Sequence, residues 1–492
     1  MKYYIGVDLG TSSIKLLLVS EQGEILRSIS RTYPIYYPKS GYSEQDPKDW
    51  WNAFLDGIKE LLCDIPAGSV RAIGVAGQMH GLVILDERDA VIRPAILWND
   101  GRTEKETAYL NEVIGKDKLF AYTGNIAFAG FTAPKLLWLR ENEPQNFEKI
   151  KKIMLPKDYI NYLLTGVHCT DYSDAAGMLL LDVKNKCWSK EMLDICGVSE
   201  RQMPKLFESF ERVGYIRKEL ADELGISRDT VVVAGAGDNA GAAIGTATVG
   251  EGKCNISLGT SGTVFVSSDS FSGDAAQAIH AFCHADGGYH LMGCILSAAS
   301  CNQWFCDEIL STKDYKAEEM AVKAERLGKN EVFFLPYLMG ERSPINDVNA
   351  TGLFIGLRPS TSRADMYQAV LEGVAFAIKD NLEIIKRFGV DVKSSCLCGG
   401  GARSKLWREI LANVLDIELN VPVTEQGPGY GAAILAMVGA GDLASVREAA
   451  EKFFSVKETV RPDRALSALY AQRYEKYRRI YPAVKELYKN IK

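Results

Sequence analysis

One short pattern occurs twice, about half the chain apart. VDLGTSSIKLLLVS (residues 7–20) and ISLGTSGTVFVSS (residues 256–268) each read as an apolar strand, a Leu-Gly-Thr-Ser turn and a second strand. A repeat at this spacing predicts two related domains that each open with the same β-hairpin. We expect the domains at residues 1–246 and 247–492, because small residues and glycines cluster at 245–252.

Composition excludes several classes of partner. The 492 residues are 47% hydrophobic and carry a net charge of −6, which is typical of a globular protein and argues against nucleic acid as the main partner. No uncharged apolar run approaches the roughly 20 residues of a membrane-spanning helix. Strand-like sequence begins by Tyr3, which leaves no room for a signal peptide. The eleven cysteines lack zinc-binding spacing and read as reduced thiols. We therefore expect a cytoplasmic protein without a membrane partner; whether it forms a homodimer stays open.

The first Gly-Thr-Ser turn has the chemistry of a phosphate site. Gly10 lets a ligand approach the backbone closely, and successive N–H groups of a turn form a concave anion site. Thr11, Ser12 and Lys15 add donors and positive charge. Asp8 would repel a phosphate unless a cation lay between them, and Mg²⁺ commonly bridges carboxylates to phosphates. The alternative is a plain hairpin in which Asp8 caps its own turn.

A second turn and a glycine stretch extend this prediction. Gly259 and Thr260 offer the same chemistry, so two turns facing each other across a cleft could hold a polyphosphate from both sides. CLCGGGARS lies between a predicted strand and an amphipathic helix, and its Gly400 and Gly401 would let a flat ring lie against the backbone. The chain contains no G-x-x-x-x-G-K-[ST], which excludes a P-loop.

Asp238 is the candidate general base. VVVAGAGDNAGAAIG (residues 231–245) reads as a strand, a glycine turn and a small-residue helix that begins near Asp238. The helix dipole there would keep the carboxylate ionised and able to accept a proton from a substrate hydroxyl. A plain helix cap is the alternative. GAGDNA also matches a loose dinucleotide fingerprint, which we discount because Asp238 would project toward the pyrophosphate.

Two more predicted strands end in polar clusters. Gln78, Met79 and His80 follow one, and Asp100 and Arg102 follow the other. Ligands of α/β sheets bind beyond the carboxyl ends of strands, so this convergence predicts a polyhydroxylated ligand; a purely structural His80 is the alternative. The H-x₃-H spacing in HAFCHADGGYH (residues 280–290) would also permit a metal site, although no clear further ligand follows. Helical periodicity predicts helices at 50–62, 366–388 and 466–492.

Taken together, the motifs resemble the FGGY family of carbohydrate kinases, of the actin, hexokinase and heat-shock ATPase superfamily, over nearly the full length. Within that family the xylulokinases are the most similar. The resemblance is carried by GVDLGTSSIK, GQMHG, ILWNDGR, TGNIAFAGFTAPKLLWLRENEP, LPKDYINYLLTG, TDYSDAAGMLLLD, GAGDNAGAAIG, SLGTSG, FLPYLMGERSP and GGGARS.

The resemblance implies an α/β protein with two ribonuclease-H-like domains and a central cleft for ATP and sugar. It implies ATP-dependent phosphorylation of D-xylulose to D-xylulose 5-phosphate in xylose catabolism, with Asp238 as base and Asp8 organising Mg²⁺ and the phosphates. The residues implied to contact sugar are Met79, His80 and Asn239; those implied to contact nucleotide are Thr11, Ser12, Thr260, Gly400, Gly401 and Ser404. Two alternatives stay open: a kinase of this family for another pentose, a pentitol or gluconate, and a non-enzymatic ATP-driven clamp.

Overall fold

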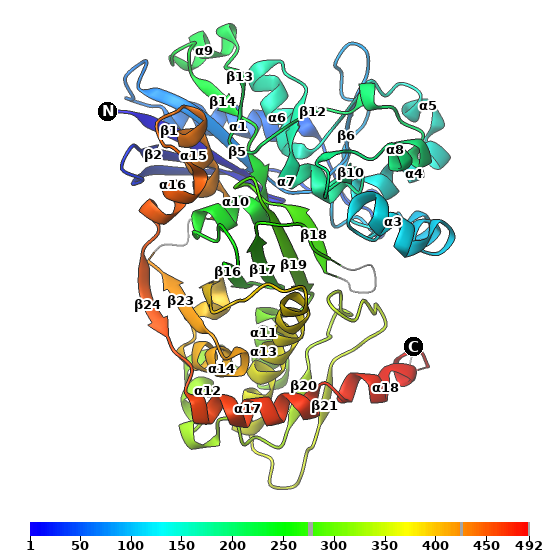
Figure 1. Cartoon of the computed structure of the whole chain (residues 1–492), viewed down its shortest axis with the longest axis vertical. Coiled ribbons are helices and arrows are strands. Elements are labelled where there is room, and N and C mark those ends of the chain that lie inside the picture. Colours follow the sequence, from blue (N-terminus) through cyan, green and yellow to red (C-terminus); the bar gives the residue numbers. More distant parts are fainter. Residues whose placement is uncertain (274–278, 424–426, 491–492) are drawn as a thin grey trace.

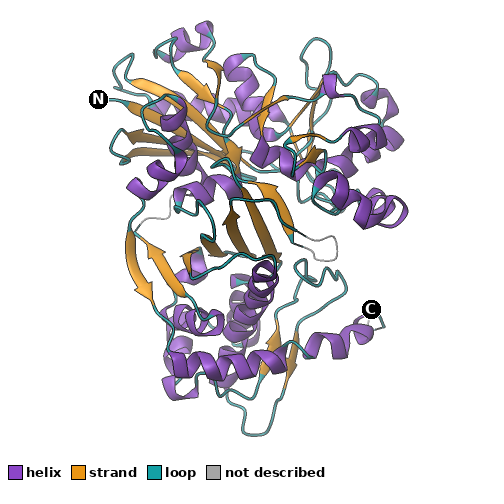
Figure 2. Cartoon of the chain, viewed as in Figure 1, coloured by secondary structure: helices purple, strands orange, loops and turns teal. Residues whose placement is uncertain are grey.

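The computed structural model describes residues 1–273, 279–423 and 427–490, and its backbone forms two sheet-centred halves, one above the other in Figure 1. Helices surround both sheets (Figure 2). The first sheet has the order β13-β14-β5-β1-β2-β3, with β15 beside β5, and the second has the order β18-β19-β17-β16-β22-β23-β24. The strands of the first are β1 (Tyr3–Leu9), β2 (Ser13–Ser20), β3 (Ile25–Thr32), β5 (Val70–Gly77), β13 (Arg212–Tyr215), β14 (Val231–Val233) and β15 (Ala236–Gly237). Those of the second are β16 (Cys254–Leu258), β17 (Gly262–Ser268), β18 (His280–Cys283), β19 (Tyr289–Ile295), β22 (Ser394–Cys398), β23 (Glu418–Pro422) and β24 (Val456–Val460).

The two sheets share one topology. In the first, β1, β2 and β3 form an antiparallel meander, and β5 and β14 add in parallel on the other side of β1. In the second, β16, β17 and β19 form the meander, and β22 and β23 add in parallel beside β16. The repeat in the sequence is therefore a repeat of architecture, and the predicted α/β fold with two ribonuclease-H-like, actin- and hexokinase-type domains is confirmed.

Apolar packing holds the first sheet between helices. α1 (Pro47–Leu61) contacts β2 and β3, and α6 (Pro156–Thr165) contacts β5. Trp50, Phe54 and Ile58 of α1 are fully buried at helical spacing, which confirms the helix predicted at 50–62. Full burial of each such side chain contributes about 1.5–3 kcal/mol. The ends of β1 and β5 are thereby held in register beside each other.

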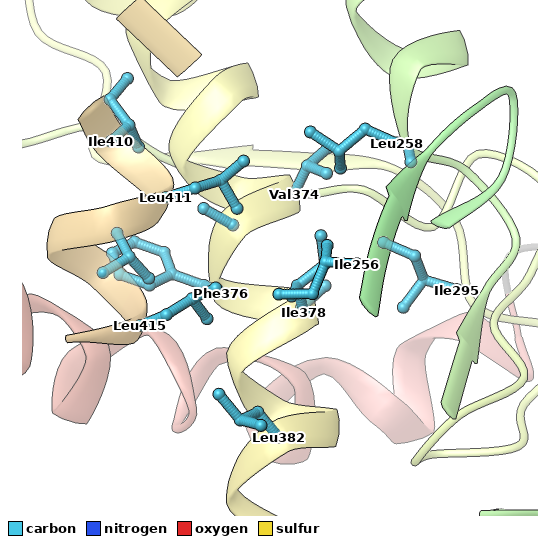
Figure 3. Close-up of a cluster of buried hydrophobic side chains, with 14 of the residues drawn as sticks. Ile256, Leu258, Ile295, Val374, Phe376, Ile378, Leu382, Ile410, Leu411 and Leu415 are labelled. Carbon is cyan, nitrogen blue, oxygen red and sulfur yellow. The ribbon is translucent and has the colours of Figure 1, made fainter. Parts of the chain in front are cut away.

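The core of the second half is built around one long helix. α13 (Arg363–Arg387) lies between the sheet and α14 (Lys405–Leu415). Figure 3 shows Val374 and Ile378 of α13 near Ile256 of β16, with Leu411 of α14 on the other side. A capping box between Ser362 and Asp365 starts α13 three residues before the predicted position.

One segment of the C-terminal half returns to the first sheet. α15 (Gly427–Gly439) packs directly on β1 and β5, and α16 (Val446–Phe453) follows it; both are orange beside the blue strands in Figure 1. Gly6 and Gly74 are register partners, and a Cβ on either would lie 1.9 Å from Gly429 O or 2.1 Å from Ala432 O, respectively. Only glycine allows this approach. The predicted boundary at residue 246 therefore does not coincide with the packing, because α15 follows it in the sequence but packs on the first sheet.

The C-terminal tail contains two helices where one was expected. α17 (Arg464–Tyr477) ends before α18 (Ile480–Tyr488) begins. Pro482 lies in the first turn of α18 and cannot donate the backbone hydrogen bond that a continuous helix requires, so the chain restarts there. Across the parts of the chain that the structure describes, no helix combines the length and apolarity needed to cross a membrane.

Candidate active site

A small cavity of about 180 Å³ lies between the two halves. Its N-terminal lining includes Met79, His80, Asp238 and Asn239, which the sequence predicts at a sugar site. Ser261, on the turn between β16 and β17, lines it from the other half. The cavity therefore brings together the ends of two strands and the start of one helix, which are far apart in the sequence. It has room for one small polar molecule.

Asp238 is the first residue of α10 (Asp238–Gly245) and is not its cap. Gly237 occupies the N-cap position. The backbone N and side-chain Nδ2 of Asn239 both donate to Asp238 Oδ1, at 2.7 and 2.9 Å. Burial raises the pKa of Asp238 to about 6, although the hydrogen bonds from Asn239 oppose the rise. Burial thus outweighs the hydrogen bonds from Asn239, and a carboxylate with a raised pKa is a better proton acceptor than an ordinary aspartate.

A buried polar network lies directly behind Asp238. The Ser173 hydroxyl accepts from Gly237 N at 3.2 Å and donates to Asp171 Oδ2 at 2.5 Å. Asp171 ends β9 (Cys169–Asp171), and its other oxygen pairs with Lys157 Nζ at 2.9 Å. All three of these side chains are fully buried, so the network holds the start of α10 in one position.

His80 presents an acceptor to the cavity. Its backbone has a φ of 69°, and its Nδ1 lies 2.7 Å from Gly177 O. Because a carbonyl only accepts, Nδ1 carries the proton and Nε2 keeps its lone pair. Burial and the nearby charges of Lys135 and Arg342 lower the pKa of His80 to about 3. The ring is therefore a neutral acceptor, stacked on Phe131 at 4.7 Å between ring centroids.

Three predicted sugar-binding residues do not line this cavity. Gln78 is buried, and its Nε2 donates to Gln45 Oε1 at 3.0 Å and approaches Gly10 O at 3.4 Å. Asp100 and Arg102 form a two-bonded ion pair at 2.7 and 2.8 Å. Arg102 also pairs with Glu44 at 2.6 Å. Gln78 therefore lies under the first turn. Asp100 and Arg102 form a buried ion pair that stabilises the fold and does not contact the cavity.

The first turn closes as the sequence predicts. Asp8 and Lys15 are cross-strand partners in the hairpin. Gly10 N donates to Ser13 O at 3.0 Å, so this amide closes the turn and does not face a ligand. Burial raises the pKa of Asp8 to about 7, and the charge of Asp238 raises it further while Lys15 lowers it. Two carboxylates that repel each other form a natural place for a cation.

The second turn is hydrogen-bonded to one wall of a larger cavity of about 880 Å³. Gly259 O accepts from Ala299 N at 2.9 Å, and Thr260 O accepts from Ala298 N at 2.9 Å. Ala299 starts α11 (Ala299–Trp304) and lines the larger cavity. Ser261 of the same turn lines the small cavity, so the turn is linked to the walls of both spaces.

Three predicted nucleotide contacts line the larger cavity: Gly400, Gly401 and Ser404. Open space lies where a Cβ of Gly400 would be. A Cβ on Gly399, which has a φ of 90°, would lie 2.6 Å from backbone atoms of Leu258, so this bend requires glycine. Ser404 caps α14 by accepting from Trp407 N at 3.0 Å. The cavity is large enough for a nucleoside, and the glycines leave one wall flat.

The histidines at 280–290 do not form a metal site. His284 lies 2.8 Å from Thr248 O, and His290 stacks on Phe265 at 4.0 Å between ring centroids. Among the described residues, no group of three or more histidine, cysteine or acidic side chains is arranged to hold a metal ion.

Sequence reasoning missed several lining residues, among them Trp98, Phe128, Phe131, His280 and Arg342. Trp98 lies within ILWNDGR and Arg342 within FLPYLMGERSP, so the motifs contained them without showing their roles.

Comparison with known proteins extends over both halves. Residues 3–245 match the N-terminal domain, and residues 254–440 the C-terminal domain, of the FGGY family of carbohydrate kinases. The chain is 40% identical over 480 residues to the xylulose kinase of Escherichia coli strain K12, covering 97% of this chain and 98% of the relative. The crystal structure of a xyloylose kinase from Brucella ovis has a TM-score of 0.93 at 39% identity, covering 99% of this chain and 100% of that one. That of a gluconate kinase from Lactobacillus acidophilus has a TM-score of 0.94 at 28% identity and covers 100% of both chains.

Two matched domains, a shared sheet topology and a cavity lined by residues of both halves agree on one assignment. The chain belongs to the FGGY family of carbohydrate kinases.

Proposed function

We propose that this protein phosphorylates D-xylulose with ATP, giving D-xylulose 5-phosphate and ADP. The observation that supports this most strongly is the presence of two cavities whose walls are linked through the second turn, with Asp238 in the smaller one. The smaller cavity has the size and polarity for a single sugar, and the larger one suits the nucleoside of ATP. The 40% identity to the xylulose kinase of Escherichia coli supports D-xylulose as the acceptor.

In this proposal Asp238 accepts the proton of the sugar hydroxyl as that oxygen attacks the γ-phosphate. Asn239 orients Asp238 through two hydrogen bonds to Oδ1, which leaves Oδ2 for the substrate. His80 Nε2 accepts from a second sugar hydroxyl and sets the angle of attack. The two turns hold the polyphosphate, so the chain contributes mainly positioning and charge neutralisation, as phosphoryl transfer requires.

The residues at the first turn fit Mg²⁺ carried by the nucleotide. Mg²⁺ prefers oxygen ligands and is usually bound by one or two carboxylates together with substrate phosphates. Asp8 supplies such a carboxylate, and the repulsion from Asp238 that raises its pKa would be relieved by a cation. When bound there, Mg²⁺ would neutralise phosphate charge; Asp8 would hold it, and Lys15 would balance the remaining charge.

A second candidate is phosphorylation of a different polyol or sugar acid. The gluconate kinase from Lactobacillus acidophilus covers the full chain at a TM-score of 0.94, so the same fold accommodates another acceptor. A clamp without kinase activity is disfavoured, because it has no use for a cavity that His80, Asp238 and Asn239 line together.

An ADP-release assay against a panel of sugars tests the proposal. The panel contains D-xylulose, D-ribulose, L-ribulose, xylitol and D-gluconate, and D-xylulose should give the highest kcat/KM. Preference for another acceptor would identify the second candidate, and sugar-independent turnover would favour the clamp.

The variant Asp238→Asn tests the assigned base. Its kcat should fall by about 10²–10⁴, because general-base removal typically costs that much. Its nucleotide affinity should stay close to that of the parent, and its melting temperature at neutral pH should be no lower than that of the parent. Asp391→Asn is the matched control, since Asp391 is a surface residue paired with Lys393. A kcat within about threefold of the parent would reject Asp238 as the base.

A further inference from the structure

The small cavity has two chemically different ends. Gln78 directly follows β5 and lies under the first phosphate turn, where its Nε2 approaches Gly10 O at 3.4 Å. Met79 lies beside Gly237, where a glycine Cβ would come within 2.9 Å of Met79 Cγ. His80 comes last, against Phe131. Gln78 contacts the first turn and His80 is two residues further along the chain, so we call the part of the cavity wall around His80 its distal end.

Two further polar side chains lie at that distal end. Arg342 lies over the Phe128 ring at 5.6 Å, and Phe128 packs edge-on against His280 at 4.9 Å. His280 is 5.6 Å from Phe131, the ring on which His80 stacks. All of these residues line the cavity. They come from both halves of the chain and form one continuous group in the cavity wall around His80.

The polar atoms of this group have hydrogen-bonding capacity to spare. His280 is 1% exposed, and its Nδ1 has no hydrogen-bond partner among the described residues. The Arg342 guanidinium forms no ion pair within the described parts of the chain; its backbone N donates to Glu341 Oε1 at 2.7 Å. A buried polar atom without a partner is costly, so such atoms in a cavity wall indicate a ligand that supplies the missing bonds.

We propose that Arg342 and His280 bind the carbonyl end of an open-chain ketose, while Asp238 receives the hydroxyl at its other end. This rests on the proposed phosphorylation of D-xylulose. A guanidinium only donates, and a ketone oxygen only accepts, so the two are complementary. His280 then adds a second hydrogen bond to the same carbonyl oxygen. Specificity for a ketose over the corresponding alditol follows, because the alditol oxygen sits on a tetrahedral carbon, which displaces it from the position of the carbonyl oxygen, and carries a proton of its own.

D-xylulose and xylitol are the substrates that test this. Both present a terminal hydroxyl to Asp238, but only D-xylulose has the carbonyl. In Arg342→Met, kcat/KM for D-xylulose should fall about tenfold to hundredfold, because a hydrogen bond from a charged donor is lost. The value for xylitol should change by less than about threefold, and the KM for ATP should not change. The ratio of the two sugars should therefore fall toward one.

Two more variants keep the test decisive. His280→Phe keeps the aromatic packing but removes both nitrogens, and it should lower the same ratio even if Arg342→Met fails to fold. Arg358→Met changes an exposed arginine paired with Glu331 and should leave the ratio unchanged.

An equal loss for both sugars in Arg342→Met and His280→Phe, or no loss for either, would overturn the assignment of the distal end. Absence of D-xylulose turnover in the parent would instead reject the proposed function.

Discussion

Trp98 Nε1 donates to Thr11 Oγ1 at 2.9 Å. Trp98 also lines the small cavity, whereas Thr11 belongs to the first phosphate turn. One side chain therefore contacts both the proposed sugar space and the proposed polyphosphate site. A sugar that displaces Trp98 would therefore also shift Thr11, through the hydrogen bond between them.

Trp98→Phe should weaken ATP more than sugar. The substitution keeps an aromatic ring against the cavity but removes the N–H that holds Thr11. The KM for ATP should rise about threefold to tenfold, the usual effect of losing one hydrogen bond, with a smaller change in the KM for sugar. Steady-state kinetics measures both. Trp188→Phe is the control, since Trp188 Nε1 donates to Pro204 O at 3.1 Å. A fall in thermal stability without any change in the KM for ATP would contradict the link.

Asp8→Asn should raise the Mg²⁺ requirement. The variant keeps the hairpin but removes the carboxylate that we assign to the cation. The Mg²⁺ concentration for half-maximal turnover should rise about tenfold to hundredfold, as for other losses at metal sites. Calorimetric titration should show sugar affinity unchanged. If sugar affinity falls together with activity, Asp8 is a structural residue.

Activity and stability should depend on pH in opposite directions. The pKa of Asp238 is about 6 in the folded protein, above the ordinary aspartate value, so kcat/KM should fall as the pH drops below 6 and the base protonates. The folded state binds this proton more tightly than the unfolded state. The stabilising contribution is therefore present at low pH and is lost as the pH rises through 6. The melting temperature of the parent should fall relative to that of Asp238→Asn between about pH 4 and pH 6 and level off above pH 6. If the melting temperatures of the two proteins change with pH in parallel, the pKa of Asp238 is not raised in the folded protein.

Ser173→Ala should lower kcat without raising KM. Ser173 touches no substrate in our assignment and acts through Gly237, so it is a positioning residue. A small displacement of Asp238 should reduce kcat about tenfold to hundredfold. Ser189→Ala is a matched control, because Ser189 is also buried and its hydroxyl accepts from Met192 N. Loss of stability in both variants with normal kcat in both would reject the positioning role.

Much of the site could be predicted because short local patterns determine it. The Gly-Thr turns at Gly10 and Gly259 are set by neighbouring residues, and Asp238 follows a strand and opens a helix in one continuous stretch. Met79 and His80 lie at a strand end, where α/β proteins bind ligands. The confirmed elements of the fold depend on contacts close in the sequence or on the repeat of one motif.

Other features required the packed structure. Arg342 and His280 reach the cavity only because the second half docks against the first, and no local pattern records that contact. Asp100 and Arg102 follow a strand, the position at which α/β proteins bind ligands. Their charges nevertheless pair with each other, and strand position alone does not show that pairing. The return of α15 to the first sheet is likewise a long-range contact.

That return has a consequence for synthesis on the ribosome. The face of the first sheet at Gly6 and Gly74 is completed only by residues 427–453, near the end of the chain. The first half therefore cannot finish folding as it emerges, unlike a domain whose core is contiguous. The sheet face at Gly6 and Gly74 stays exposed until most of the protein has been translated. A nascent chain stalled after residue 246 would therefore be a target for chaperones and proteases.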